Sequence, residues 1–349
     1  MIAKVTVINC RRRPRFDKAG ILIPAALLPL TLLSGLLVGY TGISPRQLWD
    51  CLWGTASPEI SLIIWQIRLP RLIVAALCGA GLALSGAALQ ALTHNPLADP
   101  SVLGINAGSG FSVMVYLSYF SFLHLNSLFW QPVFALAGGL VSAGLLWLLS
   151  RHHGRLDPRL LILVGIGLAA FFSALMLVMG SNMENNSYQM VARWLAGNLW
   201  GSSWYQVRIL WPWLLLLVPL MFAQNMAMDV LNLGAPQAQA LGLAVNRERI
   251  RLLLLAVALA AVSISVCGGI AFIGLAAPHI ARRLTATTWQ AQRLPATFLW
   301  GTLLLPAADT LGRCLPRDIE IPAGIVTALL AAPYFLYLLR QPEKSGGKK

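Results

Sequence analysis

Residues 67–100 read IRLPRLIVAALCGAGLALSGAALQALTHNPLADP, and this stretch decides the fold. It lies largely within an apolar run, 60–92, that exceeds the roughly 20 residues needed to cross a bilayer. We therefore expect a membrane helix that tilts or projects beyond the bilayer. Small residues recur along one face of that helix at every fourth position: Ala75, Gly79, Ala83, Ala87 and Ala91. Such a face lets a second helix approach closely within the membrane.

The composition of the whole chain agrees with a membrane protein. Of its 349 residues 57% are hydrophobic, and only 11% are charged, against about 25% in a typical soluble domain. This excludes a disordered chain and argues strongly against a soluble enzyme. Roughly 200 hydrophobic residues suffice for about ten spans. We predict an all-α integral membrane protein whose ten apolar runs lie at about 20–40, 60–92, 103–122, 131–149, 159–180, 207–223, 250–268, 270–284, 295–312 and 322–339.

Two of the less regular segments have a predicted arrangement of their own. The run at 270–284 is short enough to reach only halfway across a bilayer, and the Trp-rich segment 188–200 reads as an amphipathic helix at one membrane face. The domain division that follows is a basic cytoplasmic N-terminal segment at 1–19, a single transmembrane domain at 20–340 and a cytoplasmic tail at 341–349.

The distribution of positive charge predicts the orientation. With ten spans, 19 of the 26 lysines and arginines fall on the side that holds both termini. Basic loops are retained in the cytoplasm, so both termini are expected there. The charges form short clusters between apolar runs, which argues against nucleic acid as a partner and favours membrane lipid. The seven remaining basic residues are Arg46, Arg68, Arg71, Arg193, Arg208, Arg313 and Arg317.

Motifs for chemistry within the chain are missing from the sequence. It contains no GxxxxGK[ST] loop for ATP, no GxSxG and no HExxH. Its five cysteines show no metal spacing, and its histidines are dispersed. We therefore expect no catalytic residue, no metal site and no bound cofactor.

Ionisable residues near the outward ends of the spans leave two alternatives open. Asp309 precedes Arg313 by four residues, a spacing that lets them pair on a helix. Asp309 is either part of this structural ion pair or a proton relay, since intramembrane acids are often functional. Arg68 and Arg71 lie three apart and should share a helix face, which suits either an acidic docking partner or lipid headgroups.

The cytoplasmic stretch 225–250, NMAMDVLNLGAPQAQALGLAVNRERI, is too polar to cross the membrane. It is rich in helix formers, and Gly234 and Gly242 interrupt it. We expect two short helices outside the membrane, placed either to bind a soluble partner or to serve as a structured linker.

These features together resemble a known family. The blocks SGAALQALTHNPLADPSVLGINAGSG (85–110), GGIAFIGLAAPHIARRL (268–284), LPAADTLGR (305–313) and IPAGIVTALLAAPYF (321–335) occur in the order found in FecCD permeases. Those proteins are subunits of bacterial ATP-binding-cassette (ABC) importers for iron–siderophore complexes, haem and vitamin B12. The resemblance covers about 60–340 and leaves the basic head outside the pattern.

The resemblance implies an assembly. It implies ten spans in a bacterial cytoplasmic (inner) membrane and a second permease subunit, identical or not. It also implies an extracytoplasmic substrate-binding protein and two cytoplasmic ATPase subunits that hold ATP and Mg²⁺. Arg68, Arg71 and Arg313 match the family's docking arginines, and 227–246 matches its coupling helices. The span around 159–180 and the segment 188–200 match the region that lines and gates the path. The expected ATPase-coupling residues are Leu233, Gly234, Ala238, Ala240, Leu241 and Gly242.

The expected cargo is a ferric siderophore, carried inward through the dimer. Vitamin B12 or haem on the same architecture stays open, and so does the choice between a homodimer and a heterodimer. A proton-coupled secondary transporter that uses Asp309 is the rival from another class, since it needs no ATPase partner.

Overall fold

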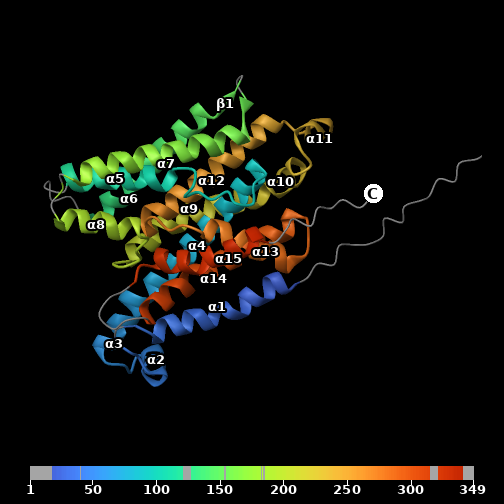
Figure 1. The fold of residues 1–349 in the computed structure, drawn as a ribbon. Helices are drawn as coiled ribbons and strands as arrows, with labels where there is room; N and C mark the ends of the chain where they lie inside the picture. Colours follow the sequence, from blue (N-terminus) through green and yellow to red (C-terminus); the bar gives the residue numbers. More distant parts are fainter. Residues whose placement is uncertain are drawn as a thin grey trace, which may run out of the picture.

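The computed structural model describes residues 18–39, 41–120, 127–152, 155–181, 183, 185–314 and 321–340. The basic head at 1–19 and the tail at 341–349 therefore lie outside it, apart from residues 18 and 19. The described chain is a bundle of helices with one hairpin of two short strands, each of two residues (Figure 1).

The helices follow the apolar runs of the sequence. In order they are α1 Ala19–Leu37, α2 Pro45–Leu52, α3 Pro58–Leu62, the π-helical turn η1 Ile63–Arg68, α4 Leu69–Thr93, α5 Ile105–Tyr119, α6 Ser127–Leu149, α7 Pro158–Gly180, α8 Asn185–Leu195, α9 Trp204–Ala223, α10 Asn225–Leu231, α11 Ala235–Ala240, α12 Val245–Cys267, α13 Ile273–Thr285, α14 Gln290–Cys314 and α15 Ala323–Arg340. Between α6 and α7, strands β1 (Arg151–His152) and β2 (Arg155–Leu156) pair antiparallel.

The all-helical membrane fold is confirmed. Each of the ten predicted apolar runs coincides with a helix, and among the described residues six helices are long and apolar enough to cross a membrane. The other four runs form α5, α13, α14 and α15. With 13 residues, α13 is about 20 Å long, so it reaches only part of the way across a 30 Å hydrocarbon core, as its short run predicted.

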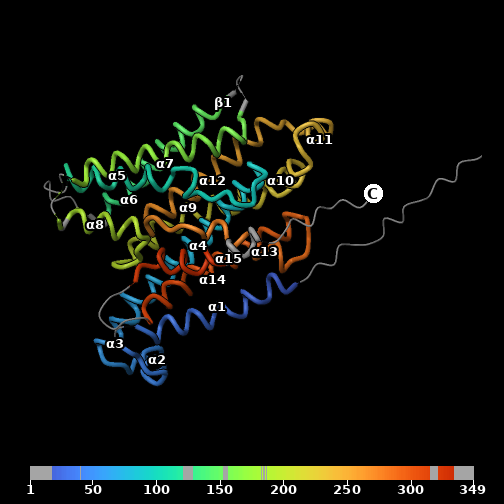
Figure 2. The backbone as a smooth tube through the Cα atoms, viewed as in Figure 1, coloured from blue at the N-terminus to red at the C-terminus, as the bar shows by residue number. Residues whose placement is uncertain are grey.

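The bundle has two polar ends that the chain contacts define. At the first, which we call the α10–α11 end, the Trp300 indole N–H donates to the Gly20 carbonyl, and Asp229 of α10 accepts from the Gln290 backbone. The hairpin joins the same end, since the Leu156 N–H donates to the side chain of Asn246. Figures 1 and 2 show α2 and α3 at the opposite, α2–α3 end, with α1 running along the edge of the bundle between the two.

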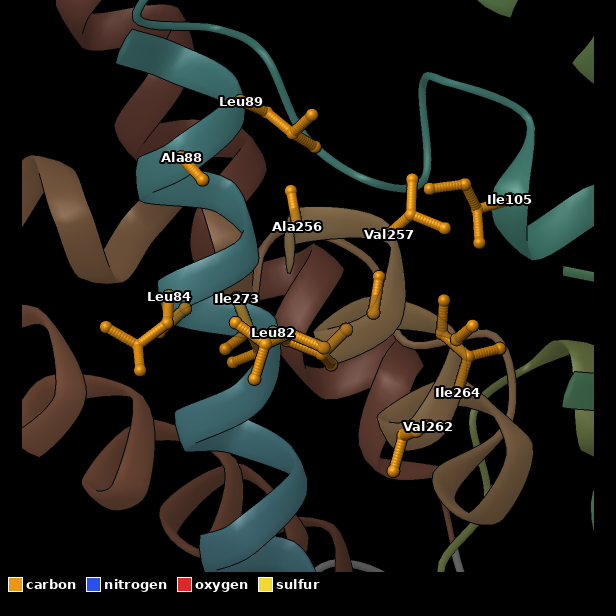
Figure 3. Packing of buried hydrophobic residues seen from close by; sticks show 14 of the residues in the cluster. Leu82, Leu84, Ala88, Leu89, Ile105, Ala256, Val257, Val262, Ile264 and Ile273 are labelled. Atoms are coloured by element: carbon orange, nitrogen blue, oxygen red, sulfur yellow. The ribbon is translucent and has the colours of Figure 1, made fainter. Parts of the chain in front are cut away.

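The core is built around α4 and α12. Most of the apolar window is buried in the continuous helical segment Pro58–Thr93, which ends in α4 (83%), and in α12 (72%), whereas the corresponding share in α7 and in α9 is 22%. Figure 3 shows the α4 residues Leu82 and Leu89 among side chains of α12. Apolar faces left open on the peripheral helices suit a lipid surrounding or another membrane subunit.

The stripe of small residues on α4 is where α14 makes its closest approach. A Cβ added to Gly79 would lie 2.2 Å from the carbonyl oxygen of Gly301 in α14, and one added to Gly86 would lie 1.7 Å from that of Gly274 in α13. Neither position can hold a larger residue without moving a backbone. The close helix approach that the spacing predicted is thus confirmed.

Candidate functional site

The first candidate site is a cluster of arginines at the α2–α3 end. Arg68, the last residue of η1, donates to the carbonyls of Leu36 and Thr41. These carbonyls lie at and just beyond the end of α1, where the last four C=O groups of a helix lack intrahelical partners. The guanidinium thus satisfies acceptors at the negative end of the α1 dipole.

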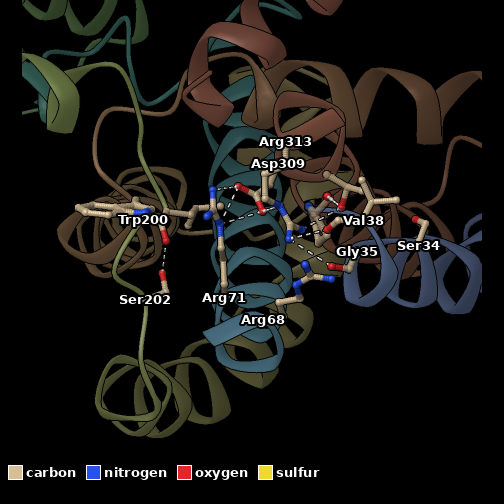
Figure 4. A network of polar contacts seen from close by, with 12 residues as sticks. Ser34, Gly35, Val38, Arg68, Arg71, Trp200, Ser202, Asp309 and Arg313 are labelled. Atoms are coloured by element: carbon tan, nitrogen blue, oxygen red, sulfur yellow. Dashed lines mark hydrogen bonds and ion pairs between the residues drawn. The ribbon is translucent and has the colours of Figure 1, made fainter. Parts of the chain in front are cut away.

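The centre of the cluster is Asp309 of α14, which two arginines approach (Figure 4). Arg71 of α4 donates from Nη2 to Oδ1 at 2.9 Å, and its Nε lies 3.1 Å from each carboxylate oxygen. Arg313 Nε lies 3.2 Å from Oδ2. The side chains of Asp309, Arg71 and Arg313 are only 1%, 9% and 5% exposed. The carboxylate therefore fastens α4 to α14.

The arginines do not form the exposed outward rim that the sequence suggested. Arg68 and Arg71 are 4% and 7% exposed in the single chain, and they contact different helices although they lie three residues apart. Arg313 also donates to the carbonyls of Gly35 and Val38. The reason is that α1 and α14 both end beside the start of α4, so each guanidinium finds acceptors within the chain.

The contacts of Asp309 bear on the choice between a structural ion pair and a proton relay. The structure brings Asp309 and Arg313 together at the predicted i,i+4 spacing and adds Arg71, a partner 238 positions away in the sequence. Both carboxylate oxygens are contacted by guanidinium groups from two helices. This arrangement is that of a structural ion pair, which agrees with the first of the two alternatives.

The second candidate site is the pair of short helices α10 and α11. As the sequence predicted, two helices form here with glycines at their boundaries: Gly234 has φ of +98° and Gly242 has φ of +83°. Side chains strain these left-handed conformations, which glycine adopts freely. Leu233 and Leu241 are 57% and 65% exposed, whereas Ala238 is fully buried and anchors α11.

The predicted coupling residues therefore divide into two groups. Leu233, Ala240, Leu241 and Gly242 are exposed, while Gly234 is half-buried and Ala238 is buried. A hollow of about 480 Å³ adjoins the exposed group and is lined by Ala235, Gln239, Leu243, Ala244, Val245, Asn246, Arg247 and Arg249. This end thus presents exposed leucines next to a basic concavity.

Two residues that sequence reasoning missed or underrated fasten α10 to the bundle. Asp229 Oδ1 accepts from the backbone N–H of Gln290, and His94 Nε2 donates to the Leu231 carbonyl, each at 2.9 Å. Burial raises the pKa of the Asp229 carboxyl, although the Gln290 N–H and Arg293 act in the lowering direction. A lone Asp within the apolar segment NMAMDVL was the available signal. His94 caps the C-terminus of α4 with φ of +53°.

No metal centre is evident among the residues that the structure describes, since they contain no group of three His, Cys, Asp or Glu side chains able to hold an ion. The cysteines that it covers, Cys51, Cys78, Cys267 and Cys314, are unpaired. The polar features that remain to be explained are thus the arginine cluster and the α10–α11 helices, which lie at opposite ends of the bundle.

Comparisons with known proteins agree with this architecture. The profile of the FecCD transport family matches residues 27–341. The iron-uptake system permease protein FeuC of Bacillus subtilis is 36% identical over 324 residues, which cover 91% of this chain and 96% of that protein. The hemin transport system permease protein HmuU of Yersinia pestis is 36% identical over 97% of this chain and 100% of its own. An inward-facing structure of a metal-chelate type ABC transporter matches with a TM-score of 0.80 and 29% identity, covering 91% of this chain and 98% of that one.

Proposed function

This chain belongs to the FecCD transport family and is a permease subunit of an ABC importer, and we propose that its cargo is a ferric siderophore. The proposal is supported by the relatives named for iron uptake and hemin transport and by a structural neighbour of the metal-chelate type. The three names mention iron, hemin and a metal chelate. Haem and vitamin B12 are the alternatives that the experiment below separates.

The α10–α11 helices are the proposed contact with two cytoplasmic ATPase subunits. The observation that carries this assignment is the exposure of Leu233 and Leu241, which lie just after two short helices outside the apolar spans. ATP and Mg²⁺ belong to those partners. The arginines of the same end support a cytoplasmic location for it and for both termini, because basic loops are retained in the cytoplasm.

The arginine cluster at the opposite end is the proposed docking region for an extracytoplasmic binding protein. Arg68, Arg71 and Arg313 are held within the chain, so they act less as free contact residues than as a fixed source of positive potential. Charges in a low-dielectric surrounding still steer an acidic partner toward them. Acidic side chains of the binding protein would then compete with the carbonyls that Arg68 and Arg313 now contact.

A second permease subunit completes the path. Exposed apolar residues on α7 and α15, including Leu163, Leu177 and Leu329 at 67%, 77% and 66%, supply faces for it. Access changes when ATP binding moves the coupling helices and the helices at the dimer axis respond. No covalent step takes place in this chain.

The test is uptake of radioactive iron by cells with and without this gene, offered on a panel of siderophores. We expect loss of uptake for one siderophore class, restored by the gene on a plasmid. Unchanged iron uptake, with loss of labelled haem or vitamin B12 uptake instead, would replace the cargo. Uptake that persists when the cognate ATPase is deleted would favour the proton-coupled alternative.

A further inference from the structure

Two hydrogen bonds fasten α10, a seven-residue helix, to two different long helices. The Asp229 carboxylate accepts from the backbone N–H of Gln290, the first residue of α14. The His94 imidazole, at the C-cap of α4, donates to the carbonyl of Leu231, the last residue of α10. A displacement of α10 therefore acts on the ends of α4 and α14 together.

The contact at Gln290 takes the place of a helix cap. The first N–H groups of a helix lack intrahelical partners, and the residue before the helix usually supplies an acceptor from its side chain. Trp289 precedes α14 and has no such acceptor. Asp229 supplies it from another element, and its negative charge also suits the positive end of the α14 dipole.

The helices α4 and α14 lie side by side from the α10–α11 end to the α2–α3 end of the bundle. α14 packs against α4 more extensively than against any other helix that the structure describes, and the two backbones meet at Gly79 and Gly301. From Gln290 to Asp309 the helix rises by about 28 Å. There Asp309 joins Arg71 of α4 through the buried ion pair. The pair is thus joined near both ends and in the middle.

We propose that α4 and α14 form one mechanical unit, latched to α10 by Asp229 and His94, that transmits displacement of the coupling helices to the arginine cluster. Asp229 is a positioning residue in this scheme, because it acts through α14 and touches neither cargo nor ATP. The proposal rests on the proposed function, in which α10 and α11 receive the ATPase.

The experiment measures how nucleotide changes the affinity of the binding protein. The complete importer, with its ATPase, second permease subunit and binding protein, is reconstituted in nanodiscs. The Kd of the binding protein is compared with and without ATP and vanadate. We expect a wild-type ratio of Kd values between about 5 and 150, the usual range for coupled sites. In Asp229→Ala we expect the ratio to fall at least about fivefold from the wild-type value. If the wild-type ratio is itself close to five, the ratio of the variant should be close to one.

Three variants separate transmission from simple loss of structure. Asp229→Asn keeps an acceptor oxygen and should retain the wild-type ratio. Gln290→Pro removes the donor from the other side of the same bond, at a helix position that accepts proline, and should lower the ratio as Asp229→Ala does. Asp157→Ala is the matched control, because Asp157 caps α7 at the same end without touching α10, and it should leave the ratio unchanged.

Each other outcome has a definite meaning. A wild-type ratio of one, or wild-type ratios in both Asp229→Ala and Gln290→Pro, overturns the proposed transmission. A ratio lowered equally by Asp157→Ala also overturns it, since capping loss in general would then explain the effect. Failure of the wild-type chain to bind any ATPase or binding protein would refute the proposed function instead.

Discussion

Replacing Asp309 by Asn tests how strongly the arginine cluster holds the bundle together. The substitution preserves size but removes the carboxylate, whose side chain is 1% exposed. The guanidiniums of Arg71 and Arg313, 9% and 5% exposed, lose their shared counter-ion. Breaking a buried ion pair by removing one partner typically costs about 3–5 kcal/mol. We therefore expect the free energy of unfolding to fall by about 3 kcal/mol, roughly a hundredfold in the folding equilibrium.

The measurement is reversible unfolding in mixed detergent and SDS micelles, followed by tryptophan fluorescence. Glu248→Gln is the matched control, since it breaks the one-turn Glu248–Arg251 pair at the α10–α11 end, where the arginine side chain is 45% exposed. Exposed pairs contribute about 0–1 kcal/mol, so this change should be small. Arg71→Met should destabilise less than Asp309→Asn, because Asp309 then keeps Arg313. In the double variant the two effects should not add.

An Asp309→Asn protein that unfolds like the Glu248→Gln control would refute the reasoning from burial. The cluster would then contribute nothing measurable to the fold. A variant with wild-type stability that has lost uptake would restore the proton-relay reading of Asp309. A variant that is destabilised but transports normally once it is inserted would dispose of that reading.

Three further predictions concern the glycines and the latch on α10. Gly79→Ala should destabilise the bundle by about 1–3 kcal/mol through overpacking against the α14 backbone, whereas Gly144→Ala, which meets nothing within 4 Å, should not; unfolding in mixed micelles distinguishes them. Gly242→Val should strain its φ of +83° by about 1–2 kcal/mol and raise the ATP hydrolysed per cargo molecule, whereas Gly242→Asn, which tolerates that conformation, should stay near wild type. Burial raises the pKa of Asp229 above its ordinary 3.8, so the folded protein loses stability as the pH rises from 3.8 through the pKa of the folded state. In thermal unfolding, the stability of the wild type relative to Asp229→Asn should therefore be lower at pH 7 than at pH 4. A relative stability that is higher at pH 7 would contradict the assignment.

The positions of the helices could be predicted from the sequence for a clear physical reason. A bilayer offers no water to unpaired backbone groups, so each apolar run must satisfy its own hydrogen bonds as a helix. The short helices α10 and α11 could also be predicted from the sequence, because Gly234 and Gly242 mark their boundaries. These signals are local, and local signals need no knowledge of the tertiary arrangement.

The partners of the arginines could not be predicted, because they depend on which helices lie side by side. Arg71 and Asp309 are 238 positions apart, and only the packing of α4 on α14 brings them together. α14 is not among the six helices that qualify as spans by composition, because its polar and ionisable residues lower its hydropathy. Inside the bundle, however, Asp309 and Arg313 pair with one another.

The unequal burial of the spans limits which of them can move during transport. Sliding α4 against α14 would drive the backbones at Gly79 and Gly301 into one another and separate Arg71 from Asp309. By contrast α7, with 22% of its apolar window buried, is packed less extensively within this subunit than α4 is. Packed interfaces switch between discrete arrangements and do not deform continuously. We therefore expect α7 to change position relative to the α4–α14 pair, which moves as one rigid body, when access alternates. Nucleotide should change the distance between spin labels on α7 and on α4, while labels on α4 and α14 keep their separation.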